Sequence, residues 1–141
     1  MSDLIIDPRA LVDAAAEAMT RAYAPYSNFH VGAALLAADG RIFCGCNIEN
    51  AAYPVTICAE RAALSAAVSA GVREFAALAV VGGHEGIIDK ICTPCGLCRQ
   101  AVSEFCSPEM PVYLGHAEGI TTLALKELLP YSFSLMEDKK S

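Results

Sequence analysis

Two short cysteine clusters contain the residues best suited to chemistry. Together they supply three thiols and one carboxyl group: Cys58 and Glu60 in the first cluster, Cys95 and Cys98 in the second. Three thiolates are one ligand short of a tetrahedral zinc shell, and an open fourth position is typical of catalytic zinc. Glu60 follows Cys58 by two residues, so it stays near the metal without being needed as a ligand. The spacing therefore predicts a catalytic zinc site, one per chain, with a carboxylate beside it.

Both clusters lie where we expect helices to begin. The free backbone N–H groups and the dipole at a helix N-terminus favour anionic sulfur. Three thiolates also leave a zinc site with negative charge that neighbouring groups must offset. Arg61 and Arg99 lie close to the ligands in the sequence. We expect their guanidinium groups to donate hydrogen bonds to the sulfur atoms.

The combination of C-x-E with P-C-x-x-C is the pattern of zinc-dependent base deaminases. Zinc in such a site lowers the pKa of its bound water to about 7, and the resulting hydroxide attacks an electron-poor ring carbon. Glu60 is then the expected proton shuttle, taking the water proton and passing it to the ring nitrogen and the leaving amine. This interpretation explains why a carboxylate accompanies the thiols.

A structural zinc knuckle is the plainer alternative, and it needs a fourth protein ligand. The candidates are Cys92, which is nearest, then Cys46, Cys44, Cys106, His30, His84 and His116. Such a knuckle explains neither Glu60 nor the position of both clusters at helix starts. It nevertheless remains open from the sequence alone.

The composition restricts the class of protein. A length of 141 residues fits one domain, 1–141, and 55% hydrophobic residues argue against disorder. The net charge of −6 argues against a nucleic-acid partner. The N-terminus lacks the pattern of a signal peptide, and no apolar run is long enough to span a membrane. We therefore expect a cytoplasmic protein with reduced cysteines and no membrane partner.

The hydrophobic periodicity predicts an alternation of helices and strands. A helix beginning at Pro8 and ending before Pro25 is followed by a hairpin, with strands 29–38 and 41–46 joined at Asp39-Gly40. The remaining predictions are helices at 58–70, 94–105 and 124–129, strands at 75–81, 111–114 and 120–123, a loop at 82–93, and a frayed tail from residue 137. This order is typical of an α/β sandwich.

The whole chain resembles the small homotetrameric cytidine deaminases of nucleoside salvage. The resemblance rests on an ordered set of segments: 23–27 (YAPYS), 29–35 (FHVGAAL), 47–53 (NIENAAY), 58–61 (CAER), 94–100 (PCGLCRQ) and 128–130 (LLP). It implies a three-layer α/β/α sandwich with a five-stranded mixed sheet. It also implies zinc bound by Cys58, Cys95 and Cys98, with Glu60 moving protons.

The same resemblance implies how a pyrimidine nucleoside would be held. Asn47 and Glu49 match the pair that grips the ribose, and Phe29 matches a residue that packs against the base. The backbone of Ala59 and the carbonyl of Thr93 are expected to contact the base O2 and amine. Without the resemblance, 47–49 would be an ordinary polar loop and Phe29 a core aromatic.

The resemblance further implies a homotetramer whose active sites are shared between subunits. Phe133 and Tyr53 match aromatic residues that reach into a neighbouring subunit's site. The expected reaction is hydrolysis of cytidine and 2′-deoxycytidine to uridine and 2′-deoxyuridine with release of ammonia. Two alternatives are a deaminase of a cytosine-bearing antibiotic nucleoside of the blasticidin type and a nucleic-acid editing deaminase. Asn47 and Glu49 argue against the first, and the acidic charge argues against the second.

Overall fold

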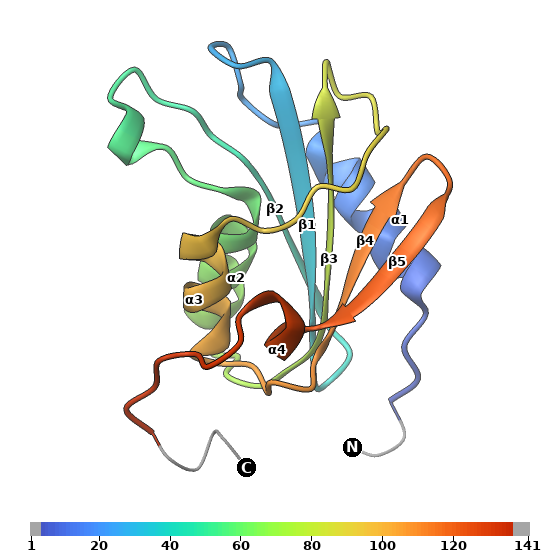
Figure 1. Cartoon of the computed structure of the whole chain (residues 1–141), viewed down its shortest axis with the longest axis vertical. Coiled ribbons are helices and arrows are strands. Elements are labelled where there is room, and N and C mark those ends of the chain that lie inside the picture. Colours follow the sequence, from blue (N-terminus) through green and yellow to red (C-terminus); the bar gives the residue numbers. More distant parts are fainter. Residues whose placement is uncertain (1–3, 137–141) are drawn as a thin grey trace.

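The structure is a computed structural model in which residues 4–136 are described. Figure 1 shows the elements in chain order. They are α1 (Pro8–Met19), β1 (Phe29–Ala37), β2 (Ile42–Cys46), the 3₁₀ turn η1 (Tyr53–Val55), α2 (Ala59–Ser69), β3 (Phe75–His84), α3 (Gly96–Ser103), β4 (Pro111–His116), β5 (Gly119–Ala124) and α4 (Leu125–Leu128). The predicted order of helices and strands is confirmed.

The five strands form one mixed sheet in the order β2-β1-β3-β4-β5. Only β3 and β4 are parallel among the described strands, and α3 lies on the crossover between them. The β1–β2 hairpin turns at Gly40, whose φ of 98° favours glycine. The N-terminal ends of α2 and α3 point the same way on one face of the sheet (Figure 1), and Cys58 and Cys95 are their N-cap residues.

Helices cover both faces of the sheet, which confirms the three-layer arrangement (Figure 1). On one face α1 packs over the sheet through Leu11, Val12 and Ala15. On the other face α2, α3 and α4 bury a second core that includes Leu35, Leu78 and Leu114. Alternate residues of β1 and β3 enter opposite cores, as a sheet covered on both faces requires.

The first helix is shorter than the sequence predicts. It begins as expected, with Asp7 accepting a hydrogen bond from Ala10 N and Pro8 at the first position, but it ends at Met19. The chain then leaves the helix because Tyr23 N donates to Asn47 O and Glu49 N donates to Tyr23 O. Tertiary pairing with the 47–49 segment therefore overrides the helical periodicity that continues through Tyr23.

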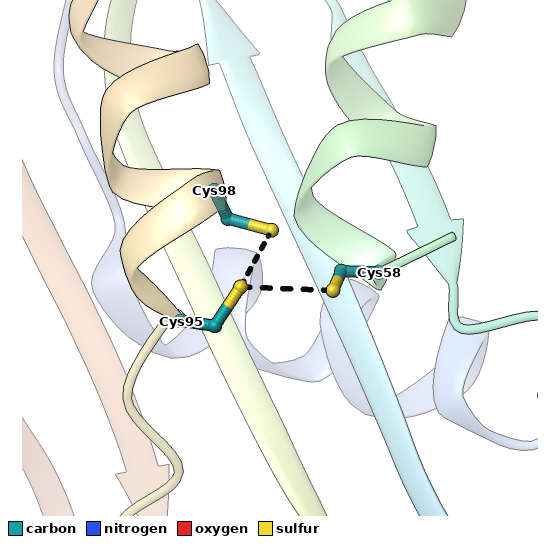
Figure 2. A group of neighbouring side chains, drawn as sticks. All are labelled: Cys58, Cys95 and Cys98. Carbon is teal, nitrogen blue, oxygen red and sulfur yellow. Dashed lines mark hydrogen bonds between the residues drawn. The ribbon is translucent and has the colours of Figure 1, made fainter. Parts of the chain in front are cut away.

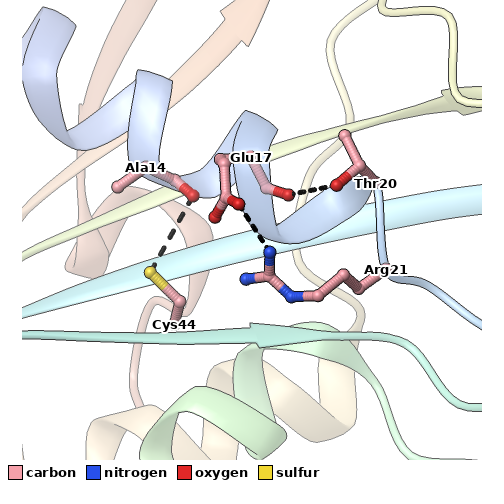
Figure 3. Close-up of polar contacts among 5 residues, drawn as sticks. All are labelled: Ala14, Glu17, Thr20, Arg21 and Cys44. Atoms are coloured by element: carbon pink, nitrogen blue, oxygen red, sulfur yellow. Dashed lines mark hydrogen bonds and ion pairs between the residues drawn. The ribbon is translucent and has the colours of Figure 1, made fainter.

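The end of α1 is fixed by contacts shown in Figure 3. The hydroxyl of Thr20 donates to Glu17 O at 2.6 Å, and Arg21 forms an ion pair with the Glu17 side chain, also at 2.6 Å. The thiol of Cys44, on β2, donates a weak hydrogen bond to Ala14 O at 3.8 Å. Cys44 thus faces α1, on the side of the sheet opposite α2 and α3.

The third strand is longer than the sequence predicts, because it continues through Gly82, Gly83 and His84. These residues pair with the start of β1, where Phe29 lies opposite His84. A side chain at Gly83 would place its Cβ 1.8 Å from Ile87 O, so glycine is needed there for close packing and does not mark a loop. The loop predicted from residue 82 therefore starts after His84. The predicted tail from residue 137 lies outside the described residues.

Gly45 controls how closely α2 approaches the sheet. A Cβ at this position would lie 2.5 Å from both Ala59 O and Ala63 N in the first turns of α2. We expect Gly45→Ala to lower the free energy of unfolding by about 2 kcal/mol, since backbone atoms must move apart. Chemical denaturation of zinc-saturated protein measures this loss.

Gly96→Ala is the matched control, because a Cβ at Gly96 meets nothing within 4 Å. It should unfold at the same denaturant concentration as the native chain. Equal stability of the Gly45 and Gly96 variants would contradict a tight contact between β2 and α2.

Within residues 4–136, no helix has the length and apolar character needed to cross a membrane.

Candidate zinc centre and adjoining pocket

Three thiols converge where the first turns of α2 and α3 meet. Cys58 is the N-cap residue of α2, Cys95 is the N-cap residue of α3, and Cys98 lies in the first turn of α3. The Sγ atoms are 3.8 Å apart for Cys58 and Cys95 and 3.5 Å apart for Cys95 and Cys98. Figure 2 shows the three side chains pointing toward a common centre.

The spacing of the thiols fits zinc. With Zn–S bonds of about 2.3 Å and tetrahedral angles, ligand sulfur atoms lie about 3.8 Å apart. The three Sγ atoms all lie within 4.8 Å of one another, and no fourth His, Cys, Asp or Glu joins this group in residues 4–136. The described residues therefore do not form a closed structural zinc knuckle. The donor set leaves one position of a tetrahedral zinc ion for a water or a substrate.

The electrostatics of the cluster favour a thiolate at Cys58. Hydrogen bonding with Cys98, then with Cys95 and Arg61, lowers the pKa of Cys58 to about 5 despite its partial burial. The pKa of Cys98 moves the other way, because it shares its proton with Cys58 and is fully buried. These hydrogen bonds therefore favour the thiolate form of Cys58, which is the form that binds zinc.

Glu60 is a buried carboxyl group at the start of α2, with only 4% of its surface exposed. Burial raises its pKa to about 7, and the nearby charge of Cys58 adds to the rise. A carboxyl group with such a pKa both accepts and donates protons readily near neutral pH. Its burial beside a thiol cluster is costly for folding and is typical of a functional group.

A cavity of about 230 Å³ brings most of the predicted site residues together. Its walls include Cys58, Glu60 and Cys95 from the two clusters, and Ala59 and Thr93 beside them. They also include three residues predicted to hold a nucleoside: Phe29, Asn47 and Glu49. The proton-transfer group and the candidate binding residues therefore face one common space.

The side chains of Asn47 and Glu49 are already engaged within the chain. Asn47 Oδ1 accepts a hydrogen bond from Val31 N at 2.9 Å, and Asn47 Nδ2 donates to Phe29 O at 2.9 Å. Glu49 accepts hydrogen bonds from Tyr26 N, Ser27 N and the Ser27 hydroxyl. The Ser27 hydroxyl contributes most to lowering the pKa of Glu49, which favours its anionic form.

Two predicted aromatic residues lie outside this cavity. Tyr53 is 73% exposed and lines a neighbouring cavity with Tyr26, Ser27 and Glu49. Phe133 is 68% exposed, and its carbonyl accepts a hydrogen bond from Gln100 Nε2 at 3.2 Å. Neither residue lines the cavity that contains Glu60. Their predicted role requires a second subunit.

The two arginines differ in what they contact. Arg61 lies close enough to Cys58 and Cys98 to interact with both, and it donates to Thr56 O at 3.3 Å. Arg99 instead donates to Pro94 O at 2.7 Å and to Leu128 O at 2.6 Å. These two hydrogen bonds hold the loop before Cys95 against α4. Backbone carbonyls compete well for a guanidinium at these distances.

Residues 6–114 match the family described as "Cytidine and deoxycytidylate deaminase zinc-binding region". This chain belongs to that deaminase family. It is 52% identical over 130 residues to the cytidine deaminase of Sporosarcina psychrophila, covering 92% of this chain and 93% of that protein. It is 45% identical, over 92% of this chain and 96% of the other, to the cytidine deaminase of Halalkalibacterium halodurans.

The fold agrees with solved structures of the family. The crystal structure of cytidine deaminase from Burkholderia pseudomallei matches with a TM-score of 0.82 and 45% identity, covering 91% of this chain and all of that one. The chain is therefore a zinc-binding deaminase, and the three thiols and Glu60 fit that class. The cytidine deaminase-like α/β fold and its zinc-dependent enzyme class agree with the expectations from the sequence.

Several residues of this deaminase's pocket were not singled out from the sequence as substrate-binding. Val31, Thr56, Ile57 and Cys92 also line the cavity. Cys92, a candidate fourth ligand for a structural knuckle, lies outside the thiol cluster, and its Sγ would be 2.8 Å from a Cβ at Gly82. Cys92 directly precedes Thr93, and this is the one sequence feature that could have indicated that Cys92 lines the cavity.

Proposed function

We propose that this chain catalyses the hydrolytic deamination of cytidine and 2′-deoxycytidine to uridine and 2′-deoxyuridine, with release of ammonia. The observation that carries this proposal is the position of Glu60. It is a single buried carboxyl group beside three thiols spaced for zinc, in the same cavity as Phe29, Asn47 and Glu49.

Cys58, Cys95 and Cys98 would hold the zinc ion. When bound, zinc supplies an activated water of lowered pKa as the nucleophile for the attack on C4 of the base. Glu60 accepts a proton from this water and delivers it to ring nitrogen N3. It then passes the second proton of the same water to the amino group, which leaves C4 as ammonia. Water is the only co-substrate, so the atoms balance.

The remaining cavity residues provide binding and orientation. Phe29 packs against the base, and the backbone of Ala59 and the carbonyl of Thr93 meet the base O2 and amine. Glu49 uses three of about four acceptor positions on its carboxylate within the chain, which leaves one for a ribose hydroxyl. Its negative charge disfavours a phosphate at the same place, so nucleosides are preferred over nucleotides.

Assembly as a homotetramer completes the proposal. The exposed side chains of Tyr53 and Phe133 are available to contact neighbouring subunits, so that active sites are shared. We place the protein in the cytoplasm, where thiols that must bind zinc stay reduced. The net charge of −6 supports small nucleosides rather than nucleic acids as substrates.

Ultraviolet absorbance follows the conversion of cytidine to uridine directly. We expect turnover of cytidine and 2′-deoxycytidine, and far slower turnover of blasticidin S. Preferential turnover of the antibiotic, or tight retention of single-stranded DNA in a filter-binding assay, would favour the alternative deaminases. A protein with a full zinc complement that leaves cytidine unchanged would overturn the proposal.

Asn47→Ala separates a ribose contact from a purely internal role. We expect the fall in kcat/KM to be about tenfold larger for cytidine than for 2′,3′-dideoxycytidine, because only cytidine offers ring hydroxyls to the amide. A loss that persists on the dideoxy substrate would measure the bonds of Asn47 to Val31 and Phe29. Equal losses on both substrates would contradict a direct ribose contact.

A further inference from the structure

Phe29 is held by side chains at both of its backbone groups. Its N–H donates to Ser27 Oγ at 3.0 Å, and its carbonyl accepts from Asn47 Nδ2 at 2.9 Å. Phe29 begins β1, where β2 no longer runs alongside, because the β1–β2 pairing ends at Gly32 and Cys46. Side chains therefore replace the missing strand on this side of Phe29.

The hydroxyl of Ser27 has two partners that belong to the active-site cavity. It accepts the Phe29 N–H, and it donates its own proton to the Glu49 carboxylate. The backbone N–H of Ser27 donates to the other carboxylate oxygen at 3.2 Å. One small side chain thus joins the residue expected at the base to the residue expected at the ribose.

The backbone around this junction is secured independently of Ser27. Glu49 N donates to Tyr23 O at 2.8 Å, and Asn28 N donates to Ala24 O at 2.9 Å. Asn28 takes a left-handed φ of 59°, which asparagine tolerates better than most residues. Loss of the Ser27 hydroxyl should therefore release one oxygen of the Glu49 carboxylate and the Phe29 amide without unravelling the loop.

Ser27 lies at the surface and not in a hydrophobic core. It lines the cavity next to the active-site cavity, and the two cavities share Glu49 and Thr56. Its hydroxyl is consequently dispensable for packing. Its hydroxyl holds one carboxylate oxygen of Glu49, while the backbone N–H groups of Tyr26 and Ser27 hold the other.

We propose that Ser27 is a positioning residue for substrate binding, which orients the Glu49 carboxylate and fixes the backbone of Phe29 through one hydroxyl. This role rests on the proposed function, because it assigns Glu49 to the ribose and Phe29 to the base. Ser27 itself does not touch the reacting atoms. Its removal should raise KM and leave kcat close to the native value.

The test compares Ser27→Ala with Ser27→Thr and with Ser107→Ala. Ser107 is the matched control, since its Oγ accepts the N–H of Glu109 two residues later, at 3.1 Å, outside the residues that line the cavity. We expect Ser27→Ala to raise KM for cytidine about tenfold, while Ser27→Thr and Ser107→Ala stay near native. Zinc per chain and the melting temperature should match among all three variants.

Coupling to Glu49 is measured by a double-mutant cycle. In a Glu49→Ala background, Ser27→Ala should cost several-fold less than in the native background, since one of its partners is already gone. An equal cost in both backgrounds, or no change in KM, would overturn the proposal while leaving cytidine turnover intact. Absence of turnover in the native protein would instead overturn the proposed function.

A measurement that does not depend on turnover distinguishes a failure of the Ser27 proposal from a failure of the proposed function. Carbon NMR of the Glu49 carboxyl group should show its pKa rising in Ser27→Ala, because the Ser27 hydroxyl lowers it in the native chain. Ser27→Thr should restore the native titration. Unchanged titration of Glu49 in Ser27→Ala would show that the hydroxyl does not orient the carboxylate, whatever the substrate.

Discussion

Replacing Glu60 with Gln is expected to lower kcat for cytidine by about 10³-fold, with one zinc ion still bound per chain. Glutamine keeps the size and burial of the side chain but cannot accept the proton that hydrolysis releases. Glu60 is 4% exposed, so an amide of the same shape preserves the packing at the start of α2. Steady-state kinetics with zinc analysis on the same sample measures both quantities.

Glu104→Gln is the control for this change, since Glu104 is exposed at the end of α3 and does not line the cavity. It should retain native kcat, zinc content and melting temperature. If Glu60→Gln kept its turnover, a group other than Glu60 would have to transfer the proton. Loss of zinc from Glu60→Gln would instead identify Glu60 as a zinc ligand and contradict its role as a proton shuttle.

Replacing Cys98 with Ala is expected to remove both the metal and the activity. The change leaves two thiols, Cys58 and Cys95, which are too few for a stable zinc site of this kind. Zinc per chain should fall well below one, and turnover should fall to background. The melting temperature should fall as well, because metal that binds only the folded chain stabilises it.

Cys106→Ala provides the comparison for Cys98→Ala. Cys106 is also buried, at 4% exposure, but its thiol does not belong to the converging group. We expect this variant to be about 1 kcal/mol less stable and to keep its zinc and turnover. If Cys98→Ala retained a full zinc complement, the three-thiol site would be wrong.

The sequence predicted the chemistry better than the boundaries of the elements. C-x-E and P-C-x-x-C have short internal spacings, so they place their side chains wherever a helix begins at Cys58 and Cys95. The order of helices and strands followed from periodicity in the same way. Local spacing was sufficient because each of these features is complete within a few residues.

Features that depend on distant pairing were beyond the sequence. The helix α1 ends at Met19 because Tyr23 pairs with the 47–49 segment, and β3 continues through Gly83 because β1 lies beside it. The hydrogen bond of Arg99 to Leu128 O likewise depends on a carbonyl 29 residues away. Periodicity within one segment contains no information about such partners.

For the candidate binding residues too, the sequence indicated which residues are involved but not their contacts with distant parts of the chain. Resemblance indicated Phe29, Asn47 and Glu49, and the structure places all three on the cavity that contains Glu60. It did not indicate that Asn47 and Ser27 hold Phe29 from its two sides. Side-chain to backbone bonds of this kind need the three-dimensional arrangement of a loop and a strand end.

Titration of zinc into metal-free protein tests the central claim most directly. Cytidine turnover and bound zinc are measured at each addition on the same sample. Turnover should rise in proportion to bound zinc and reach its plateau at about one equivalent per chain, as a single three-thiol site requires. Turnover that is already maximal without metal, or a chain that binds one equivalent and leaves cytidine unchanged, would contradict it.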